Sequence, residues 1–125
     1  MKIFNLHNIK AQKGDSFAKD AVMIFGNQKN AWQGEVLETC TENIDAVLLH
    51  LKNKEEIKLH HHGDSEEIIY ILKGEGIILQ ENSKKQNVKE GDLIFLEKNI
   101  RHSIKGSNAG LSCLCFHAPA MNFRG

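Results

Sequence analysis

Residues 59–67 read LHHHGDSEE and gather three of the seven histidines of the chain beside three acidic side chains. If the segment that holds the histidines is a β-strand, side-chain alternation places His60 and His62 on one face. His61 then points to the opposite face, where it is exposed or acts only through a neighbour. Such a cluster suits a metal site, but it is also compatible with a plain polar loop.

Two further residues can join the face that carries His60 and His62. The GDSE segment is typical of a turn, so Glu67 opens the next strand and can return to that face. His102, which follows a predicted strand and a turn, is a candidate for the third imidazole.

Three neutral imidazoles and one carboxylate form an N3O donor set, which suits divalent Fe, Mn, Ni, Co, Cu or Zn. On a six-coordinate ion this set leaves about two positions open, as a catalytic rather than a structural site requires. If the ligands meet inside a β-barrel, the barrel surrounds the ion with a dry and shaped pocket.

Short apolar runs separated by turn-forming residues recur along the chain, whereas helix-length amphipathic patterns are missing. Their spacing of about ten residues, with Gly, Asn, Asp and Ser between them, predicts an all-β sandwich or barrel. The run IIYIL is apolar on both faces, which indicates a strand covered on both sides. The predicted strands cover residues 21–25, 35–40, 46–51, 56–62, 67–72, 76–80, 86–96, 102–106 and 111–117.

The spacing around the histidines resembles the first sequence motif of the cupin family, G-x5-H-x-H-x3,4-E-x6-G. His60, His62, Glu67 and Gly74 match the motif from its first histidine onward, while Lys54 stands in place of the opening glycine. This match is the more specific of the two that the chain offers.

The second cupin motif, G-x5-P-x-G-x2-H-x3-N, is met less completely. Gly91 and His102 fall at the required spacing. Glu97 replaces the proline, Asn99 the turn glycine and Gly106 the final asparagine. Asn enters the left-handed backbone region more readily than most residues, so Asn99 is a tolerable substitute for glycine.

The resemblance implies an all-β, double-stranded β-helix (jelly-roll) cupin barrel that forms a single domain over residues 1–125. The metal motifs would span 54–74 and 91–106, and the N-terminal ~20 residues would form an arm or an exchanged strand. It also implies a homodimer and a small-molecule ligand or substrate.

The resemblance further implies a divalent metal ion bound by His60, His62, Glu67 and His102. Its spacing selects Glu67 over the adjacent acidic residue, because only Glu67 has the motif's separation from the glycine at position 74. The identity of the metal is left open.

Three functions follow from such a site. The first is a metal-dependent enzyme of the dioxygenase or a related oxidoreductase type that acts on a small molecule, because open positions can accept substrate and O2. The second is a metal-dependent isomerase or lyase, and the third is a binding or sensor module. Ile69, Ile71 and Ile104 share the parity of the ligands, so the pocket is expected to be aliphatic and poor in additional acids and bases.

Composition excludes several other classes of function. The chain has 16 basic and 16 acidic residues, so it offers no electrostatic footprint for nucleic acid or for an anionic membrane. No apolar run approaches the ~20 residues of a membrane span or resembles a secretion signal, which favours a cytoplasmic location. Three cysteines without a CxxC pair indicate small buried thiols rather than a disulfide framework.

Four other residues have weaker signals. His117 lies on the last predicted strand and is expected in the core or at the surface, although a pocket-facing position is open. His50 is expected to be a partnered core or interface residue. Tyr70 has the wrong parity to face the metal, and Trp32 is expected to serve packing.

Overall fold

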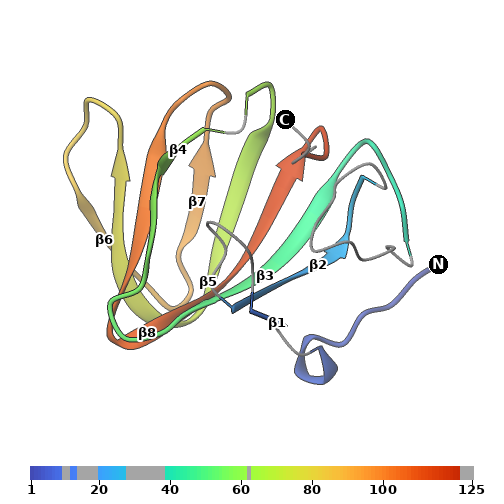
Figure 1. The fold of residues 1–125 in the computed structure, drawn as a ribbon, viewed down its shortest axis with the longest axis horizontal. Helices are drawn as coiled ribbons and strands as arrows, with labels where there is room; N and C mark the ends of the chain where they lie inside the picture. Colours follow the sequence, from blue (N-terminus) through green and yellow to red (C-terminus); the bar gives the residue numbers. More distant parts are fainter. Residues whose placement is uncertain (10–11, 14–19, 28–38, 62, 122–125) are drawn as a thin grey trace.

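Two long strands frame the molecule in the computed structural model, which describes residues 1–9, 12–13, 20–27, 39–61 and 63–121. β5 (Glu66–Gln80) and β8 (His102–Ala118) run antiparallel and pair from one end to the other (Figure 1). The remaining elements are η1 (Leu6–Asn8), a 3-10 helix, and the strands β1 (Gln12–Lys13), β2 (Asp20–Phe25), β3 (Asp45–Leu51), β4 (Glu56–His60), β6 (Gln86–Lys89) and β7 (Leu93–Leu96).

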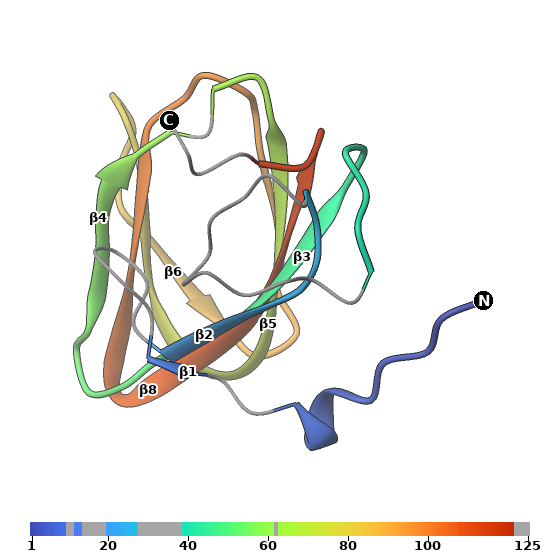
Figure 2. The same ribbon diagram turned by 45° about the vertical axis from the view of Figure 1, so that its right-hand side comes forward.

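Each long strand takes part in two sheets that face each other. The first half of β5 pairs with the second half of β8, and this sheet continues through β3, β2 and β1 on one side and β7 on the other. The second half of β5 pairs with the first half of β8, flanked by β6 and β4. Figure 2 shows the resulting barrel, which confirms the predicted all-β jelly roll.

Glycines allow the two long strands to bend from one sheet into the other. Gly74 and Gly110 have φ of 84° and 87°, which side chains rarely tolerate. A Cβ on Gly74 would also collide with the backbone oxygen of Gly110. The prediction of separate strands, with turns at 73–76 and 106–110, is therefore wrong, because the ladder bends at these glycines and continues.

Two other predicted strands differ from the structure or lie largely outside its described residues. The single predicted strand over residues 86–96 is wrong, because the structure divides it into β6 and β7. Gly91 has φ of 92°, and the carboxylate of Asp92 accepts from the Lys89 N–H at 2.8 Å, so a tight turn forms there. Most of the predicted strand 35–40 lies outside the described residues.

Apolar side chains form one cluster inside the barrel and a second on its outer face. The outer cluster centres on Ile24, Ala46 and Leu48, and Phe4 and Leu6 from the N-terminal segment pack against it. β3 is therefore covered on both faces. The inner cluster comprises Ala21, Met23, Val47, Leu49, Leu51, Ile69, Ile71, Ile78, Val88, Leu96, Ile104, Leu111, Cys113 and Cys115.

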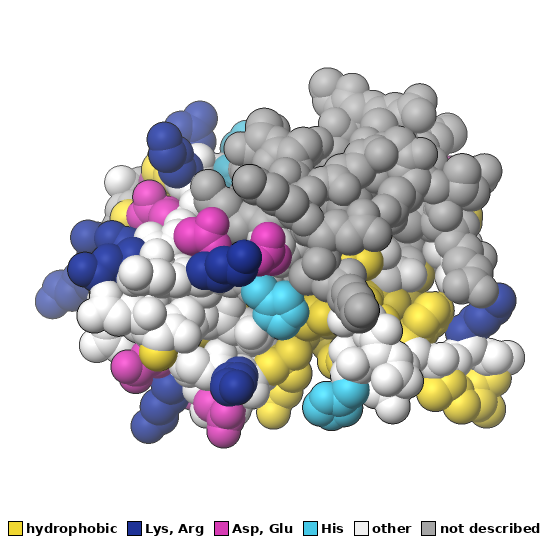
Figure 3. Space-filling model, turned by 60° about the horizontal axis from the view of Figure 1, so that its bottom comes forward, with side chains coloured by type: hydrophobic (Ala, Val, Ile, Leu, Met, Phe, Trp, Pro, Cys, Tyr) yellow, Lys and Arg dark blue, Asp and Glu magenta, His cyan; other side chains and the backbone are white. Residues whose placement is uncertain are grey.

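The surface shows mixed charge. On the part of the face described in Figure 3, Lys and Arg side chains are interspersed with Asp and Glu, in keeping with the zero net charge of the chain. Among the described residues, no helix is long and apolar enough to cross a membrane.

The bend predicts a specific difference between two glycine variants. Gly91→Ala places a Cβ in open space and carries only the backbone cost of a left-handed residue, about 1–2 kcal/mol. Gly74→Ala adds a backbone collision, so its loss of unfolding free energy is expected to be larger by at least about 1 kcal/mol. Urea unfolding of both variants measures this difference, and equal losses would contradict it.

Candidate metal centre

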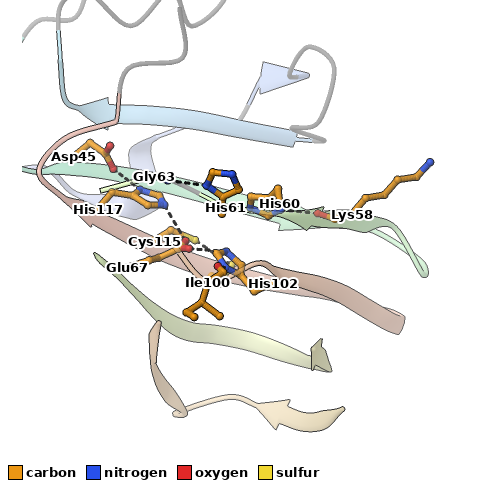
Figure 4. Close-up of polar contacts among 11 residues, drawn as sticks. Asp45, Lys58, His60, His61, Gly63, Glu67, Ile100, His102, Cys115 and His117 are labelled. Carbon is orange, nitrogen blue, oxygen red and sulfur yellow. Dashed lines mark hydrogen bonds and ion pairs between the residues drawn. The ribbon is translucent and has the colours of Figure 1, made fainter. Parts of the chain in front are cut away.

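The candidate ligands come from both sheets. His60 ends β4 and His102 begins β8, and the two are Cα partners in one sheet. Glu67 lies near the start of β5, in the other sheet. Because β5 and β8 bend, the carboxylate of Glu67 reaches His102, with 2.9 Å between Oε1 and Nε2 (Figure 4).

The turns beside the ligands are joined by a backbone contact. The N–H of Asn99 donates to the carbonyl of Gly63 at 2.9 Å, which ties the turn before β8 to the turn after β4. Asn99 has φ of 62°, the left-handed conformation expected of it, and Lys54 has φ of 57°. Both substitutions for a motif glycine thus keep a backbone conformation that glycine readily adopts.

The imidazoles of His60 and His102 lie against each other, with ring centroids 4.5 Å apart. The Nδ1 of His60 is 2.6 Å from the carbonyl of Lys58, and that of His102 is 3.3 Å from the carbonyl of Ile100. A carbonyl only accepts, so Nδ1 donates in both rings. In the neutral imidazole the lone pair is then on Nε2, the usual arrangement of a metal-binding histidine.

Glu67 is buried between two imidazoles. Its Oε1 faces Nε2 of His102, and its Oε2 lies 3.0 Å from Nε2 of His117. Only 5% of the residue is exposed. A carboxylate this buried needs cationic or hydrogen-bonding partners on both oxygens, because burial of an unpaired charge is costly.

His117 has a second carboxylate on its other side. Its Nδ1 lies 2.6 Å from Oδ1 of Asp45, and Oδ2 of Asp45 accepts from the N–H of Met121 at 2.8 Å. Asp45 is completely buried and His117 is 3% exposed. The cross-strand register explains this row, because Asp45 and Glu67 both pair with His117 from the strands on either side of it.

These contacts set the charge of His117. Burial lowers the pKa of this imidazole, but its hydrogen bonds to Asp45 and Glu67 outweigh burial and raise the pKa from 6.5 to about 9. At neutral pH an imidazolium therefore stands between two carboxylates. Beside it, the contact of Cys115 with Cys113, together with burial, raises the pKa of the Cys115 thiol well above its usual range, so this thiol stays neutral.

Sequence reasoning missed the Asp45–His117 pair. His117 was expected in the core or at the surface, with a pocket-facing position left open. The sequence predicted no role for Asp45. His117 is buried as expected, yet it contacts a candidate ligand. The available signal was a lone acidic residue before the apolar run 46–51, but only the β3–β8–β5 register joins it to His117.

The other single-residue expectations have mixed outcomes. His61 is exposed, and its Nδ1 accepts from the N–H of Gly63 at 3.1 Å. Tyr70 is 40% exposed on the outer side of its strand, as its parity predicted. His50 is half-buried and 2.6 Å from the hydroxyl of Ser112, so its expected partner is confirmed. His62 and Trp32 lie outside the described residues.

The predicted pocket-lining isoleucines belong to the inner cluster. Ile69, Ile71 and Ile104 are 2%, 0% and 3% exposed, so their side chains pack inside the barrel. The expectation that few acids or bases lie near the ligands is wrong, because His117 contacts Glu67 and Asp45 contacts His117. An open hollow of about 760 Å³ lies elsewhere, at the bend, between Lys54, Gly76 and Lys105.

The described donors fit a divalent ion in chemistry and spacing. Two donor atoms about 2.1 Å from one ion, at right angles, lie about 3 Å apart. The 2.9 Å between Glu67 Oε1 and His102 Nε2 matches that separation. Within the described ranges, which omit His62, no group of three or more His, Cys, Asp or Glu side chains is arranged so that it could hold a metal ion, so the match is limited to this one pair.

Two solved structures share this architecture. A predicted oxalate decarboxylase from Thermotoga maritima is 32% identical, with a TM-score of 0.56 over 60% of this chain and 65% of that chain. The oxalate decarboxylase of Bacillus subtilis, described with Mn(II) centres, is 24% identical, with a TM-score of 0.59 over 64% of this chain and 22% of that chain.

Sequence comparison agrees with the fold. An uncharacterized protein of Methanocaldococcus jannaschii is 42% identical over 62 residues, which are 49% of each chain. The chain thus spans about half the length of the curated relative it matches. A family profile described as "Cupin domain" matches residues 47–117, more than half of the chain. With the jelly-roll topology and the two motifs, this match shows that the chain belongs to the cupin family.

Proposed function

We propose that the protein is a single-domain cupin that holds one divalent metal ion with His60, His62, Glu67 and His102. The observation that carries the proposal is the contact of Glu67 with His102 from opposite sheets, with 2.9 Å between Oε1 and Nε2, beside the ring of His60 that lies against His102. The Mn(II) centres of a structurally similar oxalate decarboxylase lend support.

The charge around this site favours an anionic or oxygen-bearing ligand. Asp45, protonated His117 and Glu67 together carry one negative charge, so a dication would leave the centre with a net charge of about +1. Such a centre attracts small molecules that offer a carboxylate or enolate oxygen. When bound, the ion supplies Lewis acidity, and a redox-active metal adds electron transfer.

The proposed activity is that of a small-molecule metalloenzyme of the dioxygenase or oxidoreductase type. Three imidazoles and one carboxylate leave positions for substrate and O2 on a six-coordinate ion. Glu67 and the histidines hold the ion, while the aliphatic interior excludes water from the ligands. We retain cytoplasmic location as a prediction.

A second candidate is a metal-dependent lyase or isomerase. It is favoured by the 32% identity to a predicted oxalate decarboxylase and by the charged Asp45–His117 pair beside Glu67. A divalent ion held by His60, His62, Glu67 and His102 would then supply Lewis acidity toward a carboxylate substrate, without net oxidation. A small-ligand binding module without turnover is the remaining alternative.

Substitution of the two neighbouring histidines tests the metal site. His60→Ala is expected to weaken Mn(II) binding by more than the roughly 10–100-fold that loss of an outer partner costs. His61→Ala removes an exposed imidazole and is expected to retain full metal content. Elemental mass spectrometry of the desalted proteins measures the bound metal. Metal retained by His60→Ala and lost from His61→Ala would contradict the ligand assignment.

Substrate screening separates the two activities. Oxygen uptake by the Fe(II), Mn(II), Ni(II) and Cu(II) forms with enediols, flavonols, thiols and β-diketones is the result expected of a dioxygenase. Anaerobic CO2 release from oxalate or related small dicarboxylates, or turnover by the Zn(II) form, favours the lyase or isomerase. Ligand binding without turnover in every form points to a binding module.

We also propose that a second copy of the chain covers part of the outer face. Leu93 and Phe95 on β7 are 69% and 57% exposed, and they pair with Tyr70 and Ile68 on β5. This apolar surface continues across β8 into the outer cluster, whose far end the N-terminal segment covers. Large exposed apolar patches of this kind are typical of interfaces. Exchange of the N-terminal segment stays a prediction, and β1 pairs with β2 of its own chain.

A charge placed on this face is expected to dissociate the dimer. Phe95→Glu would bury a carboxylate in the apolar interface and shift the light-scattering mass from dimer to monomer. Ile77→Glu is the matched control, because Ile77 is 39% exposed on the other sheet. A wild-type protein that is monomeric at micromolar concentration would refute the proposed interface.

A further inference from the structure

The Asp45–His117 pair is more elaborate than a core contact requires. Asp45, His117 and Glu67 are polar side chains buried in one row across β3, β8 and β5. An apolar trio of similar volume would fill this space without the desolvation cost of buried polar groups. The row ends on the carboxylate that we propose as the metal ligand, which suggests that it serves that carboxylate.

The imidazole ring of His117 lies between two carboxyl groups. Nδ1 is hydrogen-bonded to Oδ1 of Asp45 at 2.6 Å, and Nε2 lies 3.0 Å from Oε2 of Glu67. Asp45 is itself held by the Met121 N–H at 2.8 Å. The position of Asp45 is therefore transmitted through the rigid imidazole ring to one oxygen of Glu67.

We propose that Asp45 and His117 are positioning residues: Asp45 holds the ring of His117, and Nε2 of His117 holds Oε2 of Glu67, which leaves Oε1 as the single oxygen that faces His102 and the metal. This inference rests on the proposed metal site. A carboxylate free to rotate could give both oxygens to one ion and occupy a further position. The row would keep that position open for a substrate, and it names two residues that the cupin motifs do not contain.

The test variant removes the contact to Oε2 of Glu67 and replaces the Asp45 carboxylate, so that Asp45 is not left as an unpaired buried charge. In Asp45→Asn/His117→Leu the asparagine oxygen can still accept from the Met121 N–H, and leucine fills part of the ring volume. His50→Leu is the matched control, because it deletes a histidine hydrogen bond between the same two strands, β3 and β8, that has no contact with Glu67. His117→Gln keeps an N–H donor and serves as the rescue variant.

Mn(II) binding to the purified chain gives readouts that a purely structural role would not move. In the double variant we expect a 10–100-fold change in Mn(II) affinity by chelator competition. We also expect an altered EPR fine structure and about one fewer water on the ion by proton relaxation. His50→Leu should match wild type in all three, whatever it does to urea stability, and His117→Gln should recover part of the wild-type signal.

The outcomes separate this inference from the function beneath it. If wild type binds Mn(II) and the folded double variant shows the same affinity, spectrum and water count, the positioning role is wrong and the metal site stands. If the double variant does not fold, His117→Phe replaces it. Its Mn(II) affinity, EPR spectrum and water count are then compared with those of His50→Leu and wild type. Failure of wild type itself to bind Mn(II), Fe(II) or Zn(II) overturns both proposals.

Discussion

The close contact between backbones at the bend of β5 and β8 is the constraint on which the rest of the structure depends. Gly74 faces the carbonyl of Gly110 across the ladder, where there is no room for a Cβ. This approach lets two continuous strands serve both sheets. Without it, Glu67 in one sheet could not stand opposite His102 in the other. The chemistry of the site is thus set by glycines far from it along the strands.

The row of Asp45, His117 and Glu67 places charge inside the barrel. Asp45, His117 and Glu67 are all buried, and their charges sum to one negative unit when the imidazole is protonated. Hydrogen bonds at 2.6 Å and 2.8 Å stabilise the Asp45 end of the row. At the Glu67 end, Oε1 faces Nε2 of His102, and the Nδ1 atoms of His60 and His102 face backbone carbonyls. The Glu67 end of the row is therefore the place where a cation would be most strongly favoured.

Much of the fold and several of the candidate ligands could be predicted from the sequence, because strand alternation and motif spacing are local features. They placed His60 and His61 on opposite faces of a strand, put Glu67 at the start of the next one and predicted an all-β sandwich or barrel. The resemblance to the cupin motifs implied the jelly roll. They failed where the information is not local. A glycine-rich segment such as KGEG is typical of a turn, and nothing near it shows that the ladder continues. The Asp45–His117 contact depends on which strands become neighbours, and the sequence does not state that order.

The rings of His60 and His102 are oriented by backbone close to them in the sequence. His60 and His102 each donate Nδ1–H to the carbonyl two residues earlier, so each ring is oriented by a contact within its own segment. Strand pairing then brings the two rings together as Cα partners. Nδ1 of each ring is thus set by backbone within two residues. Side chains elsewhere in the barrel can therefore change while the two imidazoles keep the same nitrogen directed at the backbone.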